Sequence, residues 1–328
     1  MLTIASWNVA GASLLKTDPS KRKEKQQKYN KQLQKFIEQS NPDIIVLQEV
    51  SQYCIGEQCQ TNFNIPKDYY FAMHAAIDTK THCYPPKWNK IKQSGDWPSN
   101  TYLSHGLGIL WKKKLKHSSI WNIDKKDAIT SPELSFEVVR LENGLFTGSR
   151  NTEPRLAMVA QFHYKHIDFF IINVHLTTLK GEREGFLERD KQGSIIRQKQ
   201  IDIISEGIIS RLNHDRNQRI PSKSKKDHPT IWVLAGDFNA YVDAPEITNI
   251  LRMNMQRLCD NTATKRAKNA KTASVKVDYM FAGSKYFDSK HEILDLMMQE
   301  AKNSYHVLDD IKISDHHPIV LSFMDKSN

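Results

Sequence analysis

Apolar and polar positions divide the chain into short strands and a few amphipathic helices. Continuous apolar runs, the pattern of strands covered on both faces, occupy residues 2–8, 43–49 and 230–239. Further strands are predicted at 105–113, around 134–140, and at 155–163, 167–175, 277–281 and 317–323. Apolar residues at helical spacing predict helices at 22–39, 190–213 and 244–253. Strands alternating with helices in this way predict an α/β fold.

The segment 51–102 interrupts this pattern. It contains Pro66, Pro85, Pro86 and Pro98 among scattered aromatic residues, and such punctuation is typical of loops. A length of 328 residues and an apolar fraction of 39% are sufficient for a large core. We therefore expect a single domain over 1–328, with an irregular insertion at about 51–102.

The charge balance narrows the class of partner. Lys and Arg number 47 against 37 Asp and Glu, a net charge of +10, which favours nucleic acid, nucleotides or anionic lipid headgroups. The N-terminus lacks a basic segment followed by an apolar one, and no apolar run reaches the ~18 residues of a membrane span. We expect a soluble intracellular protein, cytoplasmic by default, and the sequence does not identify protein partners.

The four cysteines are Cys54, Cys59, Cys83 and Cys259. They are too few and too irregularly spaced for a disulfide framework in a chain of this length, so reduced thiols are expected. Cys54, Cys59 and Cys83 could surround zinc together with His82. However, the C-x4-C spacing is loose and no second paired motif follows, so we favour free thiols.

Polar residues stand at the ends of the predicted strands. They are Asn8, Glu49, His175, Asp237, Asn239, Asp278, Asp315 and His316. Carboxylates are rarely buried unless they are paired or bind metal, so these strand ends suggest one convergent site.

The types of residue at these strand ends indicate a chemistry. The carboxylates of Glu49, Asp237 and Asp315 and the amides of Asn8 and Asn239 are hard oxygen donors, which suit Mg²⁺ and, as a second choice, Mn²⁺. The histidines suit acid–base or transition-state roles. Attack of water on phosphorus needs a base, positive charge and help for the leaving oxygen, and this set could provide all three.

Other catalytic motifs are absent from the sequence. It contains no G-x-S-x-G elbow, no G-x-x-x-x-G-K-[ST] loop and no H-E-x-x-H, and the close glycine pair at 106–108 lacks the rest of a dinucleotide fingerprint. Serine hydrolases, P-loop enzymes, zinc metalloproteases and nicotinamide enzymes are therefore excluded.

Seven short motifs, in order along nearly the whole chain, resemble those of the endonuclease/exonuclease/phosphatase superfamily, the fold of deoxyribonuclease I. They are WNVAG, PDIIVLQE, GLGIL, NVHL, GDFNA, VDYMF and SDHHP. The resemblance implies a four-layered α-β-β-α sandwich with a divalent-metal phosphoesterase site at one rim of its two sheets.

The resemblance also implies roles for individual residues. Glu49 is similar to the principal metal ligand, with Asn8 beside it and Asp315 as a further carboxylate of the metal site. Asp237 and Asn239 are similar to the pair that activates the nucleophile and contacts the scissile phosphate.

The histidines and one arginine have counterparts as well. Asp278 is similar to the carboxylate that orients a catalytic histidine, here His316, whereas His317 is expected at a strand edge. His175 is expected to be a general acid, and its presence argues against an abasic-site endonuclease. Arg155 precedes a strand where some relatives bind substrate phosphate with arginine, although a solvated surface arginine is the alternative.

The hypothesis that follows is a metal-dependent phosphodiesterase, most simply an endonuclease that cleaves DNA or RNA by metal-assisted attack of water. A basic segment, 264–272, is expected to lie over the rim of the site, and Trp88 and Trp97 could stack on bases or simply pack the insertion. One alternative is a phosphatase or phospholipase-type enzyme acting on phosphoinositides, sphingomyelin or a nucleotide. Another is a non-catalytic protein that binds nucleic acid.

Overall fold

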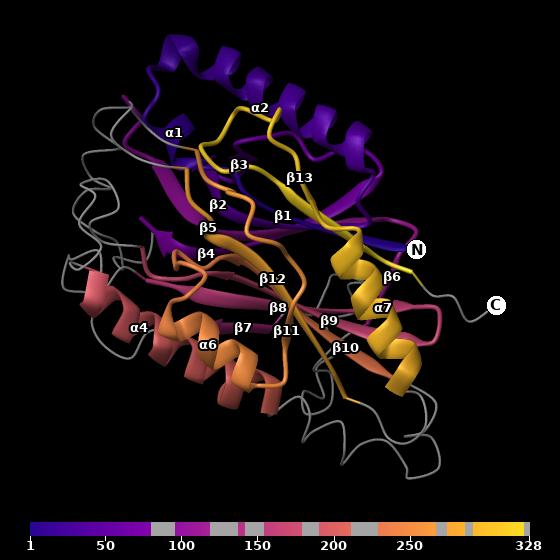
Figure 1. Cartoon of the computed structure of the whole chain (residues 1–328). Coiled ribbons are helices and arrows are strands. Elements are labelled where there is room, and N and C mark those ends of the chain that lie inside the picture. The colour runs from indigo at the N-terminus through magenta and orange to yellow at the C-terminus, as the bar shows by residue number, and fades with distance from the viewer. Residues whose placement is uncertain are drawn as a thin grey trace, which may run out of the picture.

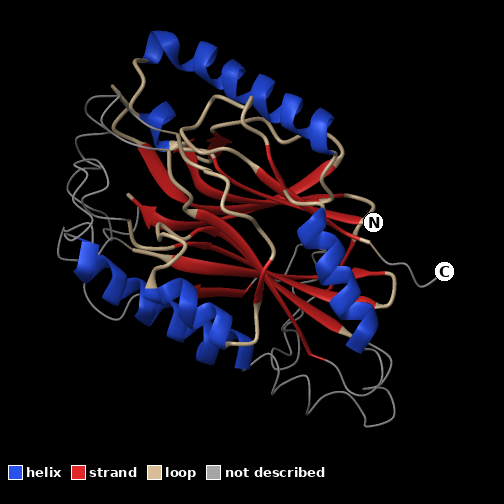
Figure 2. Ribbon diagram, viewed as in Figure 1, coloured by secondary structure: helices blue, strands red, loops and turns tan. Residues whose placement is uncertain are grey.

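In the computed structural model, two β-sheets pack face to face and helices cover their outer faces (Figures 1 and 2). The structure describes residues 1–79, 96–118, 137–141, 154–178, 190–210, 229–266, 274–285 and 291–324. The predicted four-layered α/β sandwich is confirmed.

The first sheet carries the N-terminal half of the chain and its last strand. Its order is β13 (His306–Val307), β14 (Ile319–Phe323), β1 (Leu2–Asn8), β2 (Ile44–Ile55), β5 (Thr101–Lys112) and β4 (Tyr69–Asp78), and β3 (Gln58–Thr61) pairs with β2. Only β1 and β2 run parallel among these pairs of the described chain. Their carboxyl ends therefore lie together at one edge of the sheet.

The second sheet repeats this arrangement. Its order is β11 (Gln256–Arg257), β12 (Asp278–Lys285), β10 (Thr230–Asp237), β9 (Ile167–His175), β8 (Leu156–Tyr164) and β6 (Lys116–Ser118), and β7 (Glu137–Arg140) pairs with β8. Strands β9 and β10 are parallel, so His175 and Asp237 stand opposite each other at their carboxyl ends.

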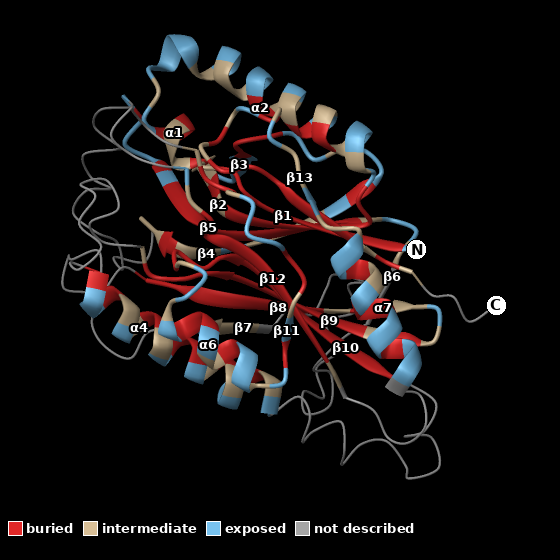
Figure 3. Ribbon diagram, viewed as in Figure 1, coloured by how far each residue is buried: buried red, intermediate tan, exposed pale blue. Residues whose placement is uncertain are grey.

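Helix α2 (Pro19–Ser40) follows the short helix α1 (Ala12–Leu15) and covers the first sheet (Figure 1). Asp18 caps α2 by accepting a hydrogen bond from the backbone of Ser20, and Asn41 ends it in a left-handed conformation. The second sheet is covered by α4 (Lys191–Asp202), its π-helical continuation (Ile203–Ser210) and α6 (Pro245–Arg252). The helices bury one face against the sheets and expose the other to solvent (Figure 3).

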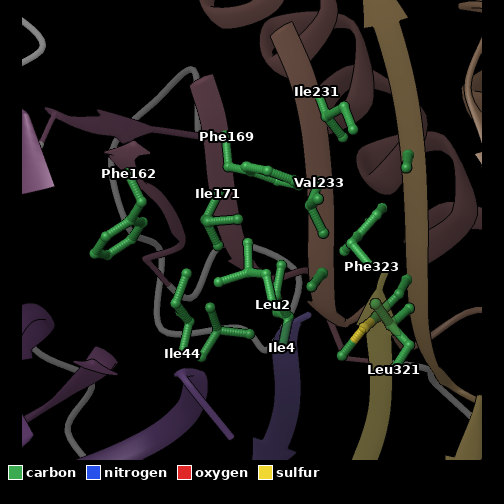
Figure 4. Close-up of a cluster of buried hydrophobic side chains, with 14 of the residues drawn as sticks. Leu2, Ile4, Ile44, Phe162, Phe169, Ile171, Ile231, Val233, Leu321 and Phe323 are labelled. Atoms are coloured by element: carbon green, nitrogen blue, oxygen red, sulfur yellow. The ribbon is translucent and has the colours of Figure 1, made fainter. Parts of the chain in front are cut away.

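The largest core cluster lies between the two sheets (Figure 4). Side chains from the first sheet, such as Ile4 and Leu321, meet side chains from the second, such as Phe169 and Val233, and all four have no solvent exposure. Helix α7 (His291–Asn303), which the hydrophobic pattern did not predict, contributes Leu294, Met297, Met298 and Ala301 to this cluster. Burial of this apolar surface holds the two sheets together.

The prediction of an irregular insertion over 51–102 is wrong for most of its described residues. Strand β2 continues to Ile55, and β3 and β4 add two more strands. Pro66 and Pro98 do not break these strands, because they lie in turns where their carbonyls accept hydrogen bonds from Tyr69 and Thr101. Residues 80–95, with Pro85 and Pro86, lie outside the described residues.

The expectation of reduced thiols is also wrong for one pair. Strands β2 and β3 form a hairpin in which Cys54 stands directly opposite Cys59, with their Cα atoms 4.0 Å apart, and a disulfide joins them. The suggested zinc site would need these sulfurs as thiolates, and its other two residues, His82 and Cys83, lie outside the described residues. Cys259 is a buried free thiol.

Trp97 serves packing rather than an open base-stacking surface. It is buried beside Leu15 and Leu103, and its ring lies under the guanidinium of Arg22 at 3.4 Å. Trp88 lies outside the described residues, as do residues 267–272 of the basic segment. Across the described parts of the chain, the helices are too short or too polar to span a membrane.

A buried polar link joins the two sheets beneath the ends of the parallel strands. Asn173 of β9 donates to the carbonyls of Leu47 and Gly108, both at 3.0 Å, and accepts a hydrogen bond of 2.8 Å from Gln48. Asn173 and Gln48 have no solvent exposure. This link fixes the spacing of the sheets where the polar strand ends meet.

We expect Asn173→Ala to lower the free energy of unfolding by about 2–4 kcal/mol, because it leaves several buried polar groups unpaired. Urea denaturation followed by circular dichroism measures this loss, with Asn303→Ala on the exposed end of α7 as the control. A loss equal to that of the control would show that the link does not stabilise the fold.

Candidate active site

The polar strand ends of both sheets converge on Asp237. Within the second sheet, Asp237 pairs with His175 on β9 and with Asp278 on β12. From the first sheet, the Nδ2 atom of Asn8 donates to the Oδ2 atom of Asp237 at 2.9 Å. The site therefore lies across the gap between the sheets, and both sheets are needed to build it.

Glu49 reaches this site through a bulge in β2. The pairing register with β5 shifts between Leu47 and Val50, and Glu49 adopts a left-handed backbone with φ of 54°. The backbone N–H of Gly11 donates to the Glu49 carbonyl at 2.9 Å, and a Cβ atom on Gly11 would come within 2.5 Å of that oxygen. Only glycine therefore fits at position 11 without displacing the bulge.

Asn8 links the two acidic side chains. Its Nδ2 atom lies 3.2 Å from Oε1 of Glu49 as well as 2.9 Å from Asp237, while its Oδ1 atom accepts a hydrogen bond from the backbone of Ala10. The predicted role of Asn8 as a metal ligand would use Oδ1, which the structure turns away from the carboxylates. In this geometry Asn8 acts as a bridge between Glu49 and Asp237.

Asp237 is almost completely buried. Its Oδ1 atom accepts a hydrogen bond of 2.9 Å from the backbone of Asn239, which itself has a left-handed φ of 49°. Burial raises the pKa of Asp237 to about 6; His316 opposes the rise and Asp278 adds to it. A carboxyl group with this pKa can exchange protons near neutral pH.

His316 is held by Asp278. Its Nδ1 atom donates to the Asp278 carboxylate at 2.9 Å, and its Nε2 atom lies 3.7 Å from Oδ2 of Asp237. Burial alone would lower the pKa of His316, but the two carboxylates outweigh burial and raise it to about 9. His316 is therefore a charged imidazolium at neutral pH.

His175, unlike His316, is a neutral imidazole. Arg155 lies behind it, with Nη1 at 3.0 Å from His175 Nδ1 and Nη2 donating to Thr178. An arginine can only donate, so Nδ1 accepts and the proton of the neutral imidazole is on Nε2, 3.7 Å from Asp237 Oδ2. Burial, followed by the charge of Arg155, holds the pKa of His175 well below 6.5.

Asp315, like Glu49, lies outside the closest acidic and histidine cluster. Among the described residues, the close acidic and histidine cluster consists of Asp237, Asp278 and His316, and Asp315 is not part of it. Asp315 is half-buried. Burial raises the pKa of Tyr29 to about 12, and the charges of Glu49 and Asp315 add to the rise.

Two residues near the site were missing from the predicted set. His105 of β5 is buried, with Nε2 at 4.0 Å from Oε2 of Glu49. Lys265 is 6% exposed, bridges the backbone of His316, and its charge acts on the pKa of Asp237 and both site histidines. Lys265 is the first basic residue of the segment 264–272 already noted in the sequence. His105 directly precedes the GLGIL motif, but no chemical role was predicted for it.

Comparison with known proteins finds a family match over most of the chain. The model of the Endonuclease/Exonuclease/phosphatase family matches residues 5–316. A search of the curated proteins gave no significant match.

Solved structures of similar fold cover nearly the whole chain. A humanized D. rerio TDP2 carrying 14 mutations is 17% identical, with 98% of each chain covered and a TM-score of 0.51. The human Nocturnin catalytic domain with a bound sulfate anion is 13% identical, covering 98% of this chain and 93% of that chain with a TM-score of 0.52. A Bacteroides vulgatus endonuclease/exonuclease/phosphatase is 14% identical, covering 98% and 99% with a TM-score of 0.53. At these identities the likeness shows the fold.

Proposed function

The chain belongs to the endonuclease/exonuclease/phosphatase family and is therefore a phosphoric ester hydrolase, and we propose that it is a divalent-metal-dependent endonuclease acting on DNA or RNA. The observation that carries this proposal is the pair of histidines on Asp237. Nε2 of neutral His175 and Nε2 of charged His316 both lie 3.7 Å from the same carboxylate oxygen. Two such donors beside one acidic group suit a phosphodiester, which needs a base and positive charge together.

The donor set fits a divalent metal. The carboxylates of Glu49 and Asp237 are hard oxygen ligands, of the kind that Mg²⁺ and Mn²⁺ prefer. The side chain of Glu49 is 28% exposed, so an ion has access from solvent. We propose that Glu49 is the principal ligand of Mg²⁺, with Mn²⁺ as a substitute and Asp315 as a nearby carboxylate. When bound, such an ion supplies positive charge to the phosphate oxygens and acidifies bound water.

The protein's own groups divide the remaining work. Asp237 and Asn239 orient the attacking water, and Asp237 accepts its proton. His316, fixed by Asp278, directs its charge toward the phosphate. His175 donates its Nε2 proton as a hydrogen bond to the leaving oxygen, a role that its low pKa favours over proton transfer from an imidazolium.

Nucleic acid is the favoured substrate because the chain carries a net charge of +10. A phosphoinositide, sphingomyelin or nucleotide remains the alternative within the same family. A non-catalytic role has less support, because every predicted site residue is present and most of them converge. The cytoplasmic location stays a prediction, and the Cys54–Cys59 disulfide counts against it, since disulfides persist mainly in oxidising compartments.

The test is conversion of supercoiled plasmid to nicked circle by the purified chain in Mg²⁺ or Mn²⁺. Parallel reactions contain EDTA, single-stranded RNA, or vesicles with phosphoinositide or sphingomyelin. Nicking that is lost in EDTA supports the endonuclease. If folded protein cleaves neither nucleic acid but releases a lipid headgroup, the nuclease proposal is wrong and the alternative holds.

We expect Arg155→Ala to lower kcat by about 10- to 100-fold, because His175 loses the donor that fixes its tautomer and ring orientation. The readout is the initial rate of cleavage at saturating substrate. Arg252→Ala, at the exposed end of α6, is the control. An unchanged kcat with a raised KM would instead indicate that Arg155 binds substrate phosphate, the role first expected from the sequence.

A further inference from the structure

Glu49 faces a second histidine that lies outside the predicted catalytic set. Its Oε1 atom lies 4.0 Å from Nε2 of His175, and its Oε2 atom lies 4.0 Å from Nε2 of His105. The two histidines come from different sheets, β9 and β5. The carboxylate thus has an imidazole nitrogen beside each of its oxygens.

His105 is itself held by a residue two positions after Glu49. The Nδ1 atom of His105 lies 3.0 Å from the hydroxyl of Ser51, and both residues are buried. Ser51 has little freedom, because its N–H donates to the side chain of Asn62 at 3.1 Å and its carbonyl accepts from the backbone of Asn62 at 3.0 Å. The backbone that carries the Ser51 hydroxyl is thus fixed next to the imidazole.

The direction of the Ser51–His105 hydrogen bond decides what His105 offers to Glu49. When the hydroxyl donates to Nδ1, the imidazole proton is on Nε2 and faces Oε2 of Glu49, which attracts it. The opposite tautomer would turn a lone pair toward the carboxylate and repel it. The arrangement with a proton on Nε2 is therefore the stable one.

We propose that His105 is a positioning residue: held by Ser51, it orients the carboxylate of Glu49 for metal binding. Glu49 stands on a bulge with a left-handed backbone, and the Gly11 contact fixes its main chain but not its side-chain torsions. Asn8 holds Oε1 through its hydrogen bond of 3.2 Å, and His105 is the described group that faces Oε2. The inference rests on the proposed metal site but not on the identity of the substrate.

The test is isothermal titration of the purified full-length chain with Mn²⁺, without substrate. His105→Ala is expected to weaken Mn²⁺ binding by about 10-fold, in line with the usual effect of removing a group that orients a metal ligand. His105→Gln, whose amide can still donate toward Glu49, is expected to recover most of the affinity. Ser51→Ala is expected to fall between the wild type and His105→Ala.

His163→Gln is the matched control. His163 also bonds a carboxylate, that of Asp168 at 3.0 Å, but at the opposite end of β8 and β9. The melting temperature in EDTA separates folding from positioning, since a purely structural role would lower it and would not be rescued by glutamine. Wild-type affinity in His105→Ala, or no Mn²⁺ binding by the wild type, would overturn the inference. Wild-type Mn²⁺ binding without any nuclease activity would overturn the proposed substrate alone.

Discussion

Asp237→Asn is expected to lower kcat by about 10³-fold, the usual range for loss of a general base being 10²–10⁴. Asparagine keeps the size of the side chain but cannot accept a proton from water. It also removes the negative charge that Nε2 of both His175 and His316 faces at 3.7 Å. The rate of plasmid nicking at saturating Mg²⁺, measured in single turnover, gives the change in the chemical step.

Asp168→Asn provides the control for this substitution. Asp168 also pairs with a histidine and lies on β9, at the end away from His175. We expect it to change kcat by less than about 3-fold, as is usual for a substitution outside the reacting groups. Circular dichroism of Asp237→Asn should match the wild type. If folded Asp237→Asn retained more than about a tenth of the wild-type rate, another group would have to be the base.

The layers of the fold could be predicted because each sheet centre is covered on both faces. Such strands are continuous apolar runs, as at 43–49 and 230–239, and polar residues mark their carboxyl ends. Those residues, Glu49 and Asp237, belong to the site, so the same signal located strands and candidate chemistry together. The polar positions at strand ends were informative because burial makes an unpaired carboxylate costly.

Elements outside the sheet centres gave weaker signals. Strand β4 is half-exposed along much of its length and is apolar apart from His74 and Asp78. Prolines on both sides of it suggested loops instead. The Cys54–Cys59 disulfide depends on the hairpin register, which sequence spacing alone does not specify. The hydrophobic pattern did not predict helix α7. Its apolar face is recognised in the structure, where it packs into the core between the sheets.

The charge states of the site histidines depend on contacts between distant parts of the chain. Arg155 lies 20 residues before His175, and Asp278 lies 38 residues before His316. No local pattern separates a histidine beside an arginine from one beside a carboxylate. For this reason the sequence indicated both residues but could not show that one is neutral and the other charged.

Loss of the His316 imidazole is expected to lower kcat by about 10³-fold, and Asp278→Asn by about 10²-fold, because the first removes the group and the second its orientation and charge. His316 is nearly inaccessible to solvent and bonds Asp278 at 2.9 Å. We therefore do not expect a molecule from solvent to replace the lost imidazole. Single-turnover cleavage of the His316→Ala and Asp278→Asn variants measures both losses. The adjacent His317→Gln is the control, expected to change kcat by less than about 3-fold, since it keeps the backbone N–H that donates to the Thr264 carbonyl.

The double variant that combines His316→Ala with Asp278→Asn decides whether Asp278 acts through His316. Residues that work as one unit give losses that are far from additive in free energy. Once the imidazole is gone, Asp278 has nothing to orient, so the double variant should lose about 10³-fold, like His316→Ala alone. A loss of about 10⁵-fold, the product of the two single effects, would mean that Asp278 contributes independently, as a metal ligand would. In that case Asp278 would belong with Glu49 among the residues that hold the ion, and His316 would keep its role without an orienting partner.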